Sequence, residues 1–465
     1  MAHHHRLQQG LQYLGSKLGL DRHETLKLLL SGITFFFVIA SYSILRSLKT
    51  SIFLAFVGRE YEPWAKIFSI LVMVPAMLVY AKVIDRFKRH QTVYFFLGFY
   101  AVITLIFAGF FAHPVYGVAN AVASPYRLVG WLFEIFMDLF QALIVGTFWS
   151  FVNSISSTSF ASRSYGPIVA CSRVGGILTT VLSWYLLEYT LLPETTTIPF
   201  LTGITAIFLL LAVYCVYLVQ HLVPEAYLHG YEAGYKVEVT HERKHLRTGI
   251  FEGLRLMITQ PYVMGIFALV FSFEIINIIF DYQMHILMSI ETHNHVRAMS
   301  SFMLLYTGTF QSLSLLFAAF GTSRMIKRLG IKYCLMVMPV ICIFLAIMPV
   351  LYPKLITIFV VMVILRALNY GFNHPLREIL FIPTVKDIQF KSKAWIESFG
   401  RTLSKTTGST FNIFAAQAPY FAIILQSVFT ISFAIMWGGI ALLVGRKYLK
   451  TIDDGKVIGN QTDRD

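Results

Sequence analysis

Apolar runs of about 20 residues recur along the chain, with short polar segments between them. A helix of about 20 apolar residues spans the hydrocarbon core of a bilayer, so each run predicts one transmembrane helix. The twelve predicted helices cover residues 28–57, 64–84, 92–112, 126–152, 167–189, 197–223, 262–291, 299–320, 332–352, 355–376, 393–416 and 421–445. We therefore predict an all-α integral membrane protein with two six-helix halves, residues 1–223 and 262–465, joined by a polar central loop, residues 224–261.

The composition narrows the class of protein further. Of the 465 residues, 56% are hydrophobic and only 13% are charged, which is too apolar for a soluble protein of this length. The four cysteines lie in apolar segments without metal or disulfide spacing, so we expect buried free thiols. The chain has no GxxxxGK, CxxC or GxSxG motif. Its HExxH match, at residues 241–245, stands in the polar central loop rather than on a predicted helix, where a zinc-binding HExxH would have to lie. The sequence therefore predicts neither an enzyme nor a resident cofactor or metal centre.

Lysine and arginine gather in alternate loops, which predicts the orientation through the positive-inside bias. The basic segments precede the first helix and occur at residues 85–89, in the central loop, at residues 324–332 and in the C-terminal tail. The opposite loops contain few cations, such as Arg127 and Arg297. We therefore expect both termini in the cytoplasm and the chain in a bacterial inner membrane. The net charge of +14 suits anionic lipid and an anionic solute, and we expect no nucleic-acid partner.

Ionisable residues inside the predicted helices are the strongest functional signal, because such residues usually line a cavity or pair with one another. Arg46 and Lys49 lie on one face of the first helix, and each costs about 2.5–3.5 kcal/mol at the membrane centre. Glu134 and Asp138 share a face of the fourth helix. The other positions in this class are Arg173, Glu274, Asp281, His285, Arg366, Lys393, Glu397, Arg401 and Lys405.

The signs of these charges point to an anionic ligand. Seven cations stand against five acids, so pairing among the side chains leaves a cationic surplus. A solute with several phosphates would use that surplus through charge-assisted hydrogen bonds. The alternative is that the charges are structural ion pairs and gate contacts, since buried pairs also serve conformational specificity.

A weak internal repeat agrees with two halves. The basic turn at residues 85–89 has a counterpart at residues 324–328, and the segment 172–176 resembles 404–408. Duplicated halves around a central loop are the plan of major facilitator transporters, which bind substrate near the middle of the membrane. The recurrence of basic turns also has a simpler explanation, because cytoplasmic loops are generally basic.

Several segments resemble one transporter family, in the same order along nearly the whole chain. They are residues 42–46 with Lys49, residues 138–153, residues 277–283, residues 375–383 and residues 391–409. These segments resemble the bacterial and plastid ATP/ADP translocases. The resemblance implies a twelve-helix exchanger, similar to the major facilitators, that swaps nucleotides across a membrane without hydrolysing them.

The resemblance also implies which charges matter. The functionally important charges of the family map onto Lys49, Asp138, Asp281 and Lys393. The chain departs from the family pattern at Thr50, where an acid is common, and at the two aspartates, where glutamate is usual. Another nucleotide set, a dinucleotide or another phosphorylated solute therefore stays open beside ATP and ADP.

Our hypothesis from the sequence is alternating-access antiport of anionic nucleotides by a monomer in the lipid bilayer. The predicted substrate-binding residues are Arg46, Lys49, Asp138, Arg173, Asp281, Arg366, Lys393, Arg401 and Lys405, and the predicted gate or ion-pair residues are Glu134, Glu274, His285 and Glu397. One alternative is proton-coupled symport, in which His285 or an aspartate titrates. Another is a membrane receptor that has this fold but does not transport.

Overall fold

The fold consists almost entirely of helices. The computed structural model describes residues 19–87, 89–156, 158–228, 252–317, 322–381, 383–384, 388, 392–416, 421–454 and 458–459. In these ranges the β structure is limited to one isolated bridge between Thr384 and Ile458. Most of the central loop, residues 229–251, lies outside the described residues, as do Lys88 and Lys391.

The helices divide into two units. The first part of the chain forms α2 (Arg22–Phe56), η1 (Arg59–Tyr61), α3 (Glu62–Arg86), α4 (Arg89–Ala112), α5 (Leu128–Phe140), η2 (Gln141–Val145), α6 (Gly146–Ser154), α7 (Thr158–Tyr189), α8 (Glu194–Leu222) and η3 (Glu225–Tyr227). The second part forms α10 (Glu252–Thr259), α11 (Pro261–Glu291), α12 (Val296–Leu316), α13 (Thr322–Leu351), α14 (Leu355–Leu368), η5 (Asn369–Asn373), α15 (His374–Leu380), α16 (Lys393–Trp395), η7 (Ile396–Gly400), α17 (Arg401–Ala416) and α18 (Ala422–Asp453).

The units do not follow the chain in two unbroken blocks. Unit 1 contains residues 1–58, 71–246 and 295–308, and unit 2 contains residues 59–70, 247–294 and 309–465. The helices α3 and α12 each contribute to both units, because the boundaries at residues 70 and 308 fall inside them. The division into halves at residues 223 and 262 stays a prediction.

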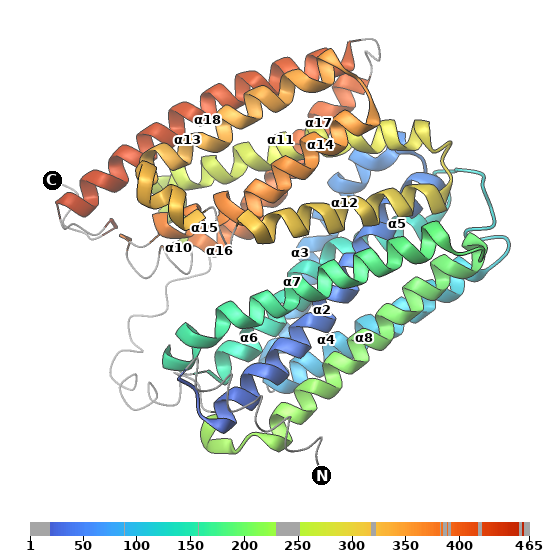
Figure 1. Cartoon of the computed structure of the whole chain (residues 1–465), viewed down its shortest axis with the longest axis horizontal. Coiled ribbons are helices and arrows are strands. Elements are labelled where there is room, and N and C mark those ends of the chain that lie inside the picture. Colours follow the sequence, from blue (N-terminus) through green and yellow to red (C-terminus); the bar gives the residue numbers. More distant parts are fainter. Residues whose placement is uncertain are drawn as a thin grey trace. The chain divides into compact units, whose positions relative to one another are not determined.

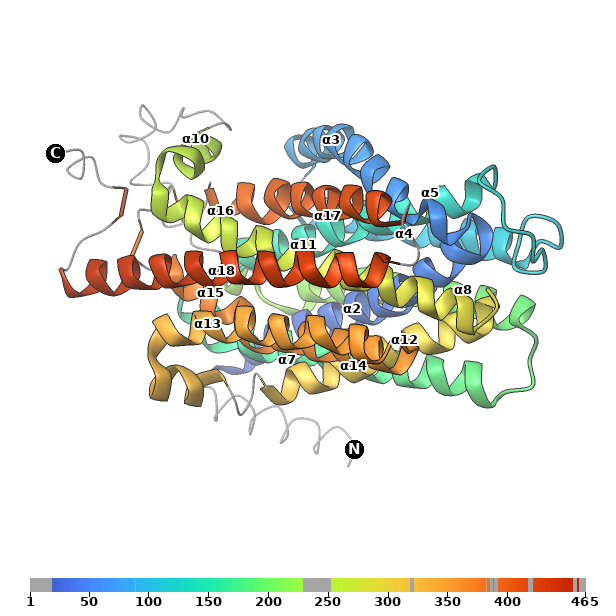
Figure 2. The same ribbon diagram turned by 90° about the horizontal axis from the view of Figure 1, so that it is seen from above.

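One long helix is central to each unit. In unit 1, α2 packs against α5, α7 and α8, and in unit 2, α11 packs against α14, α17 and α18 (Figures 1 and 2). Close approach is possible because glycine stands at the contacts: a Cβ at Gly175 on α7 would lie 2.7 Å from the carbonyl oxygen of Phe36 on α2. Each central helix carries some of the intramembrane ionisable residues, such as Lys49 on α2 and Asp281 on α11, and each packs against helices that carry others.

The helices confirm an all-α membrane protein. Nine of the described helices are long and apolar enough to cross a membrane. Three of the twelve predicted spans, at α3, α12 and α16–α17, do not meet that measure. The helix α17 has only 16 residues and is rich in hydroxyl and basic side chains, which explains its low hydropathy. The number twelve therefore stays a prediction.

Among the complete elements of the described residues, three are π-helical turns that the apolar pattern did not predict. The segment η2 lies between α5 and α6, η5 lies between α14 and α15, and η7 lies between α16 and α17. Such turns occur frequently at functional sites, since they rotate the side chains that follow. Each one lies beside ionisable residues: Asp138 precedes η2, Arg366 precedes η5, and η7 contains Glu397.

Candidate functional site

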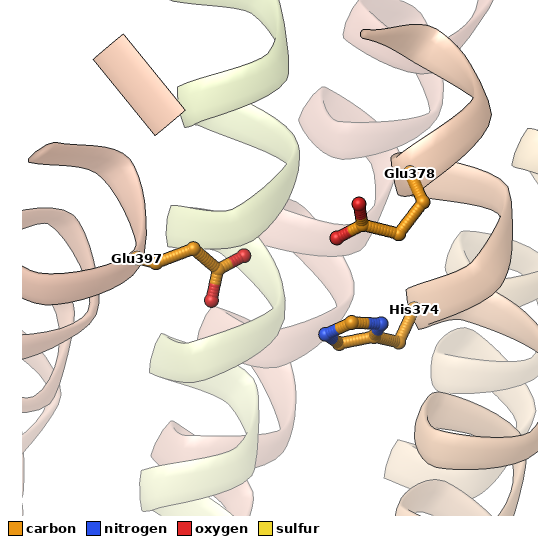
Figure 3. Close-up of side chains that lie close together, drawn as sticks. All are labelled: His374, Glu378 and Glu397. Atoms are coloured by element: carbon orange, nitrogen blue, oxygen red, sulfur yellow. The ribbon is translucent and has the colours of Figure 1, made fainter. Parts of the chain in front are cut away.

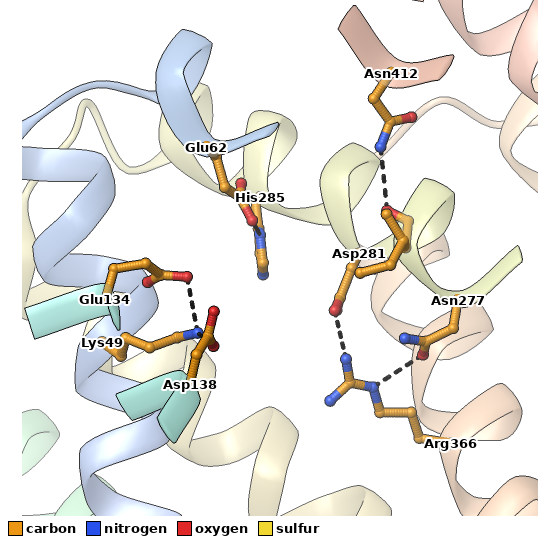
Figure 4. A network of polar contacts seen from close by, with 10 residues as sticks. Lys49, Glu62, Glu134, Asp138, Asn277, Asp281, His285, Arg366 and Asn412 are labelled. Carbon is orange, nitrogen blue, oxygen red and sulfur yellow. Dashed lines mark hydrogen bonds and ion pairs between the residues drawn. The ribbon is translucent and has the colours of Figure 1, made fainter. Parts of the chain in front are cut away.

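In unit 1, Lys49 is held by two acids. The Lys49 Nζ atom lies 2.8 Å from Glu134 Oε1 and 2.9 Å from Asp138 Oδ1 (Figure 4). The exposed fractions of the side chains are 10% for Lys49, 2% for Glu134 and 22% for Asp138. The three groups thus form a buried network with one cation and two anions, and Asp138 is its most accessible member.

Helix geometry explains how this contact arises. Gly130, Glu134 and Asp138 recur every four residues on one face of α5. A Cβ at Gly130 would lie 2.6 Å from Val57 Cγ2, so the glycine lets the start of α5 approach the end of α2 closely. Asp138 lies two turns after Gly130 on α5, and Lys49 lies two turns before Val57 on α2. The two helix faces that meet at Gly130 and Val57 therefore also bring Asp138 into contact with Lys49. The spacing in the sequence predicted that Glu134 and Asp138 share a face of α5. In the structure Lys49 contacts both acids on that face.

Unit 2 contains a second arrangement of the same kind. The Arg366 Nη2 atom on α14 lies 2.5 Å from Asp281 Oδ2, and the Arg366 Nε atom donates to Asn277 Oδ1 at 3.2 Å (Figure 4). Asn277 and Asp281 are four residues apart on α11. The Arg366 guanidinium also lies 5.9 Å from the ring centroid of Phe310, which is within reach of a cation–π interaction. Each unit therefore contains a buried cation that contacts two polar side chains one helical turn apart.

A buried pair in unit 2 joins α3 to α11. The His285 Nδ1 atom lies 2.6 Å from Glu62 Oε1, and both side chains are at most 9% exposed. The other polar atoms of this pair, Glu62 Oε2 and His285 Nε2, have no hydrogen-bond partner in the described ranges. His285 was predicted as a gate residue, but Glu62 was not selected, because it stands at a predicted helix end near the loops.

A larger charged cluster lies where α11, α15, η7 and α17 meet in unit 2. Arg401 contacts Glu397, with 2.6 Å between Nη2 and Oε2, and it lies 3.6 Å from Glu274 through Nε. Lys393 contacts Glu378, with 2.5 Å between Nζ and Oε2. The cluster unites residues that the sequence assigned to substrate binding with residues that it assigned to gating. It also includes Glu378, which was not predicted as a site residue.

The remaining predicted site residues are half-buried. Arg46 lies one turn from Tyr42, with its guanidinium 5.9 Å from the ring centroid, and Tyr42 stacks on Phe140. Arg173 on α7 and Lys405 on α17 are each partly accessible. The role of these three cations in substrate binding stays a prediction.

Sequence reasoning missed several polar residues of the site. Asn277 contacts Arg366, and His374 and Arg377 lie in or beside the charged cluster of unit 2. These positions are evident only once the helices are packed together. The spacing of four residues between Asn277 and Asp281, and between His374 and Glu378, was the available signal. Such spacing is common in helices and becomes informative only when a third group faces the pair.

The helices and these buried networks define a multi-pass membrane protein with ion pairs inside each helical unit. Solved transporter structures share the fold. A bacterial homologue of the human lysosomal transporter Spinster, in an inward-facing and unoccupied conformation, has a TM-score of 0.57, with 12% identity over 92% of this chain and 98% of that one. A mutant of the nucleoside transporter NupG has a TM-score of 0.56, with 14% identity over 92% and 99%. At these identities the likeness shows the major facilitator fold alone.

The chain belongs to the TLC ATP/ADP transporter family, whose model matches residues 13–444. Similar curated relatives include ADP,ATP carrier protein 1 of Rickettsia prowazekii (strain Madrid E), which is 23% identical over 90% of this chain and 92% of its own length. The carrier of the same name from Rickettsia conorii (strain ATCC VR-613 / Malish 7) is 23% identical over 96% of both chains. The family expected from the sequence motifs is thus confirmed.

Proposed function

We propose that the protein exchanges anionic nucleotides, of which ATP and ADP are the leading candidates, by alternating access. Support comes from the family and from the relatives that are named ADP,ATP carriers. We also propose that it acts as a monomer in a bacterial inner membrane with both termini in the cytoplasm, which is supported by the distribution of lysine and arginine.

The observation that carries this function is the pairing of buried cations with acids. Lys49 contacts Glu134 and Asp138, and Arg366 contacts Asp281. A phosphate offers the same kind of charged oxygen as a carboxylate, so it can compete for these cations. We propose that nucleotide phosphates displace Asp138 from Lys49 and Asp281 from Arg366, since these two acids are the more accessible partners.

The same competition explains exchange. When nucleotide leaves, each acid returns to its cation and again forms a buried ion pair. Breaking such a pair without a replacement costs about 3–5 kcal/mol, because it leaves an uncompensated buried charge. A bound anion supplies the replacement before the helices move. The empty carrier is therefore expected to reorient slowly, and the loaded carrier quickly, which couples the exit of one nucleotide to the entry of another.

Counter-exchange in liposomes tests this proposal. Purified protein is reconstituted into vesicles that contain unlabelled ADP, and uptake of labelled ATP is followed. We expect rapid uptake into ADP-loaded vesicles and uptake at least about tenfold slower into empty vesicles, a ratio that corresponds to about 1.4 kcal/mol between the two reorientation barriers. Equal uptake into loaded and empty vesicles would contradict obligatory exchange.

Proton-coupled symport is a second candidate mechanism, and the pair of Glu62 and His285 favours it. Both side chains are buried and titratable, and each has one polar atom without a hydrogen-bond partner. Tyr282, three residues before His285 on α11, interacts electrostatically with Glu62 and also with Arg59 and Glu60. If a proton on this pair drives transport, an imposed pH gradient should drive labelled uptake into vesicles without internal nucleotide. Uptake that depends on internal ADP and ignores the pH gradient would leave exchange as the mechanism.

A further inference from the structure

Three potential metal ligands meet in unit 2. His374 and Glu378 are four residues apart on α15 and lie on one face of it, and Glu397 comes from the π-helical turn η7. One ligand atom from each residue lies within 4.8 Å of the other two. Figure 3 shows His374 and Glu378 pointing from one helix toward Glu397 on another. An imidazole and two carboxylates are a donor set that divalent cations such as Mn²⁺ accept.

The donor atoms of this set are available. Lys393 contacts Glu378 through Oε2, and Arg401 contacts Glu397 through Oε2. Among the described residues, no hydrogen-bond or ion-pair partner contacts the second oxygen of either carboxylate or the imidazole of His374. Each carboxylate can therefore keep its cation and still offer an oxygen to a metal ion.

A buried arginine beside these ligands supplies an independent observation. Arg377, on α15 between His374 and Glu378, is only 2% exposed, and none of its three guanidinium nitrogens has a hydrogen-bond partner within the part of the chain that the structure describes. The Nε atom of Arg401 also lacks one. A buried guanidinium without a partner is costly, and its donors match the oxygens of a phosphate. The cluster thus offers ligands for a cation and unused donors for an anion.

The net charge of the cluster indicates whether it would bind a divalent cation alone, a phosphate alone or both together. The cluster has equal numbers of acids and cations, namely Glu274, Glu378 and Glu397 against Arg377, Lys393 and Arg401. A divalent cation alone would leave two uncompensated positive charges, and a doubly charged phosphate alone would leave two negative ones. A divalent cation that carries a phosphate preserves the balance.

We propose that His374, Glu378 and Glu397 bind a divalent cation together with a phosphate group whose oxygens contact Arg377. This inference rests on the proposed function, because the phosphate would be that of the transported nucleotide. The substrate would then occupy unit 2 as its metal complex, and the metal would come with the substrate rather than reside in the protein. Lys393 and Arg401 would position the two carboxylates.

Pulsed electron paramagnetic resonance of Mn²⁺ tests this site directly. The full chain is placed in lipid nanodiscs with Mn²⁺ and pyrophosphate, a probe that contains no nitrogen. His3, His4 and His5 are replaced by glutamine in every sample, so that the N-terminal histidines cannot bind the metal. We expect one population of bound Mn²⁺ with both a ¹⁴N coupling from His374 and a ³¹P coupling from pyrophosphate.

Variants assign the couplings to residues. His374→Gln should remove the ¹⁴N coupling, and Arg377→Gln should keep it while weakening pyrophosphate binding by about tenfold or more. Glu397→Gln should weaken Mn²⁺ binding, whereas Glu397→Asp, which keeps the carboxylate, should retain most of it. His221→Gln and Glu291→Gln, at exposed positions, are matched controls that should change neither coupling. A ¹⁴N coupling that survives His374→Gln in a folded protein would overturn the proposal.

The outcome is separable from that of nucleotide exchange. If both couplings appear but liposomes show no exchange, the proposed function fails and the metal site stands. If exchange runs at full rate in excess chelator and Mn²⁺ shows no ¹⁴N coupling, the metal site fails and the function stands.

Discussion

Lys49→Gln is expected to abolish counter-exchange of ATP for ADP. The substitution removes the ammonium group that contacts Glu134 and Asp138, so phosphate would meet these two acids without the charge of Lys49. A buried charge pair that loses one partner costs about 3–5 kcal/mol. If about 3 kcal/mol of this cost appears as weaker binding of the nucleotide, the affinity for the nucleotide falls by about a hundredfold. Initial rates of labelled ATP uptake into ADP-loaded liposomes measure the effect.

Matched variants separate lost transport from lost folding. Lys49→Arg keeps the charge and should retain part of the activity, although a guanidinium cannot reproduce the compact ammonium geometry. Lys49→Gln combined with Glu134→Gln leaves one acid instead of two, so it should improve folding without restoring exchange. Lys450→Gln, at an exposed position on α18, should leave transport unchanged. Normal exchange by Lys49→Gln would remove Lys49 from the substrate site.

The sequence predicted the membrane fold and the main charged positions for a simple reason. Apolar runs and intramembrane charges can be recognised locally in the sequence, and each changes the free energy of membrane insertion by a large amount. The spacing of Glu134 and Asp138 even placed both acids on one face. Sequence could not show that Lys49, 85 residues before Glu134, lies opposite that face, because this depends on how α2 packs against α5.

The residues that sequence reasoning missed were overlooked for a common reason, namely their position in the predicted helices. Glu62 and Arg377 stand near predicted helix ends, where charged residues are normally solvated, but packing buries both. The π-helical turns η5 and η7 also change which side chains face the cluster, and an extra residue in a helical turn is set by tertiary contacts rather than by local propensity. The cluster of His374, Glu378 and Glu397 therefore emerges only from the packed helices.

Asp281→Asn is expected to tighten nucleotide binding and slow turnover. Asp281 contacts Arg366, and under the proposed mechanism it competes with incoming phosphate for this arginine. Asparagine removes the negative charge while preserving size. We expect KM and the maximal exchange rate to fall together, each by about tenfold, which corresponds to about 1.4 kcal/mol of lost competition. Kinetics of ATP uptake over a range of external concentrations measure both.

The partner residue provides the opposing test. Arg366→Lys should raise KM, because an ammonium cannot bind two phosphate oxygens with the two-pronged geometry of the guanidinium. Asn277→Ala removes the neutral contact alone and should have the smaller effect. If Asp281→Asn instead raises KM while the protein remains folded, Asp281 binds the nucleotide directly, through a hydroxyl or an amino group, rather than competing with its phosphates. KM is expected to fall in Asp281→Asn and to rise in Arg366→Lys. Both expectations follow from the premise that the Asp281 carboxylate and a nucleotide phosphate bind alternately to the buried Arg366.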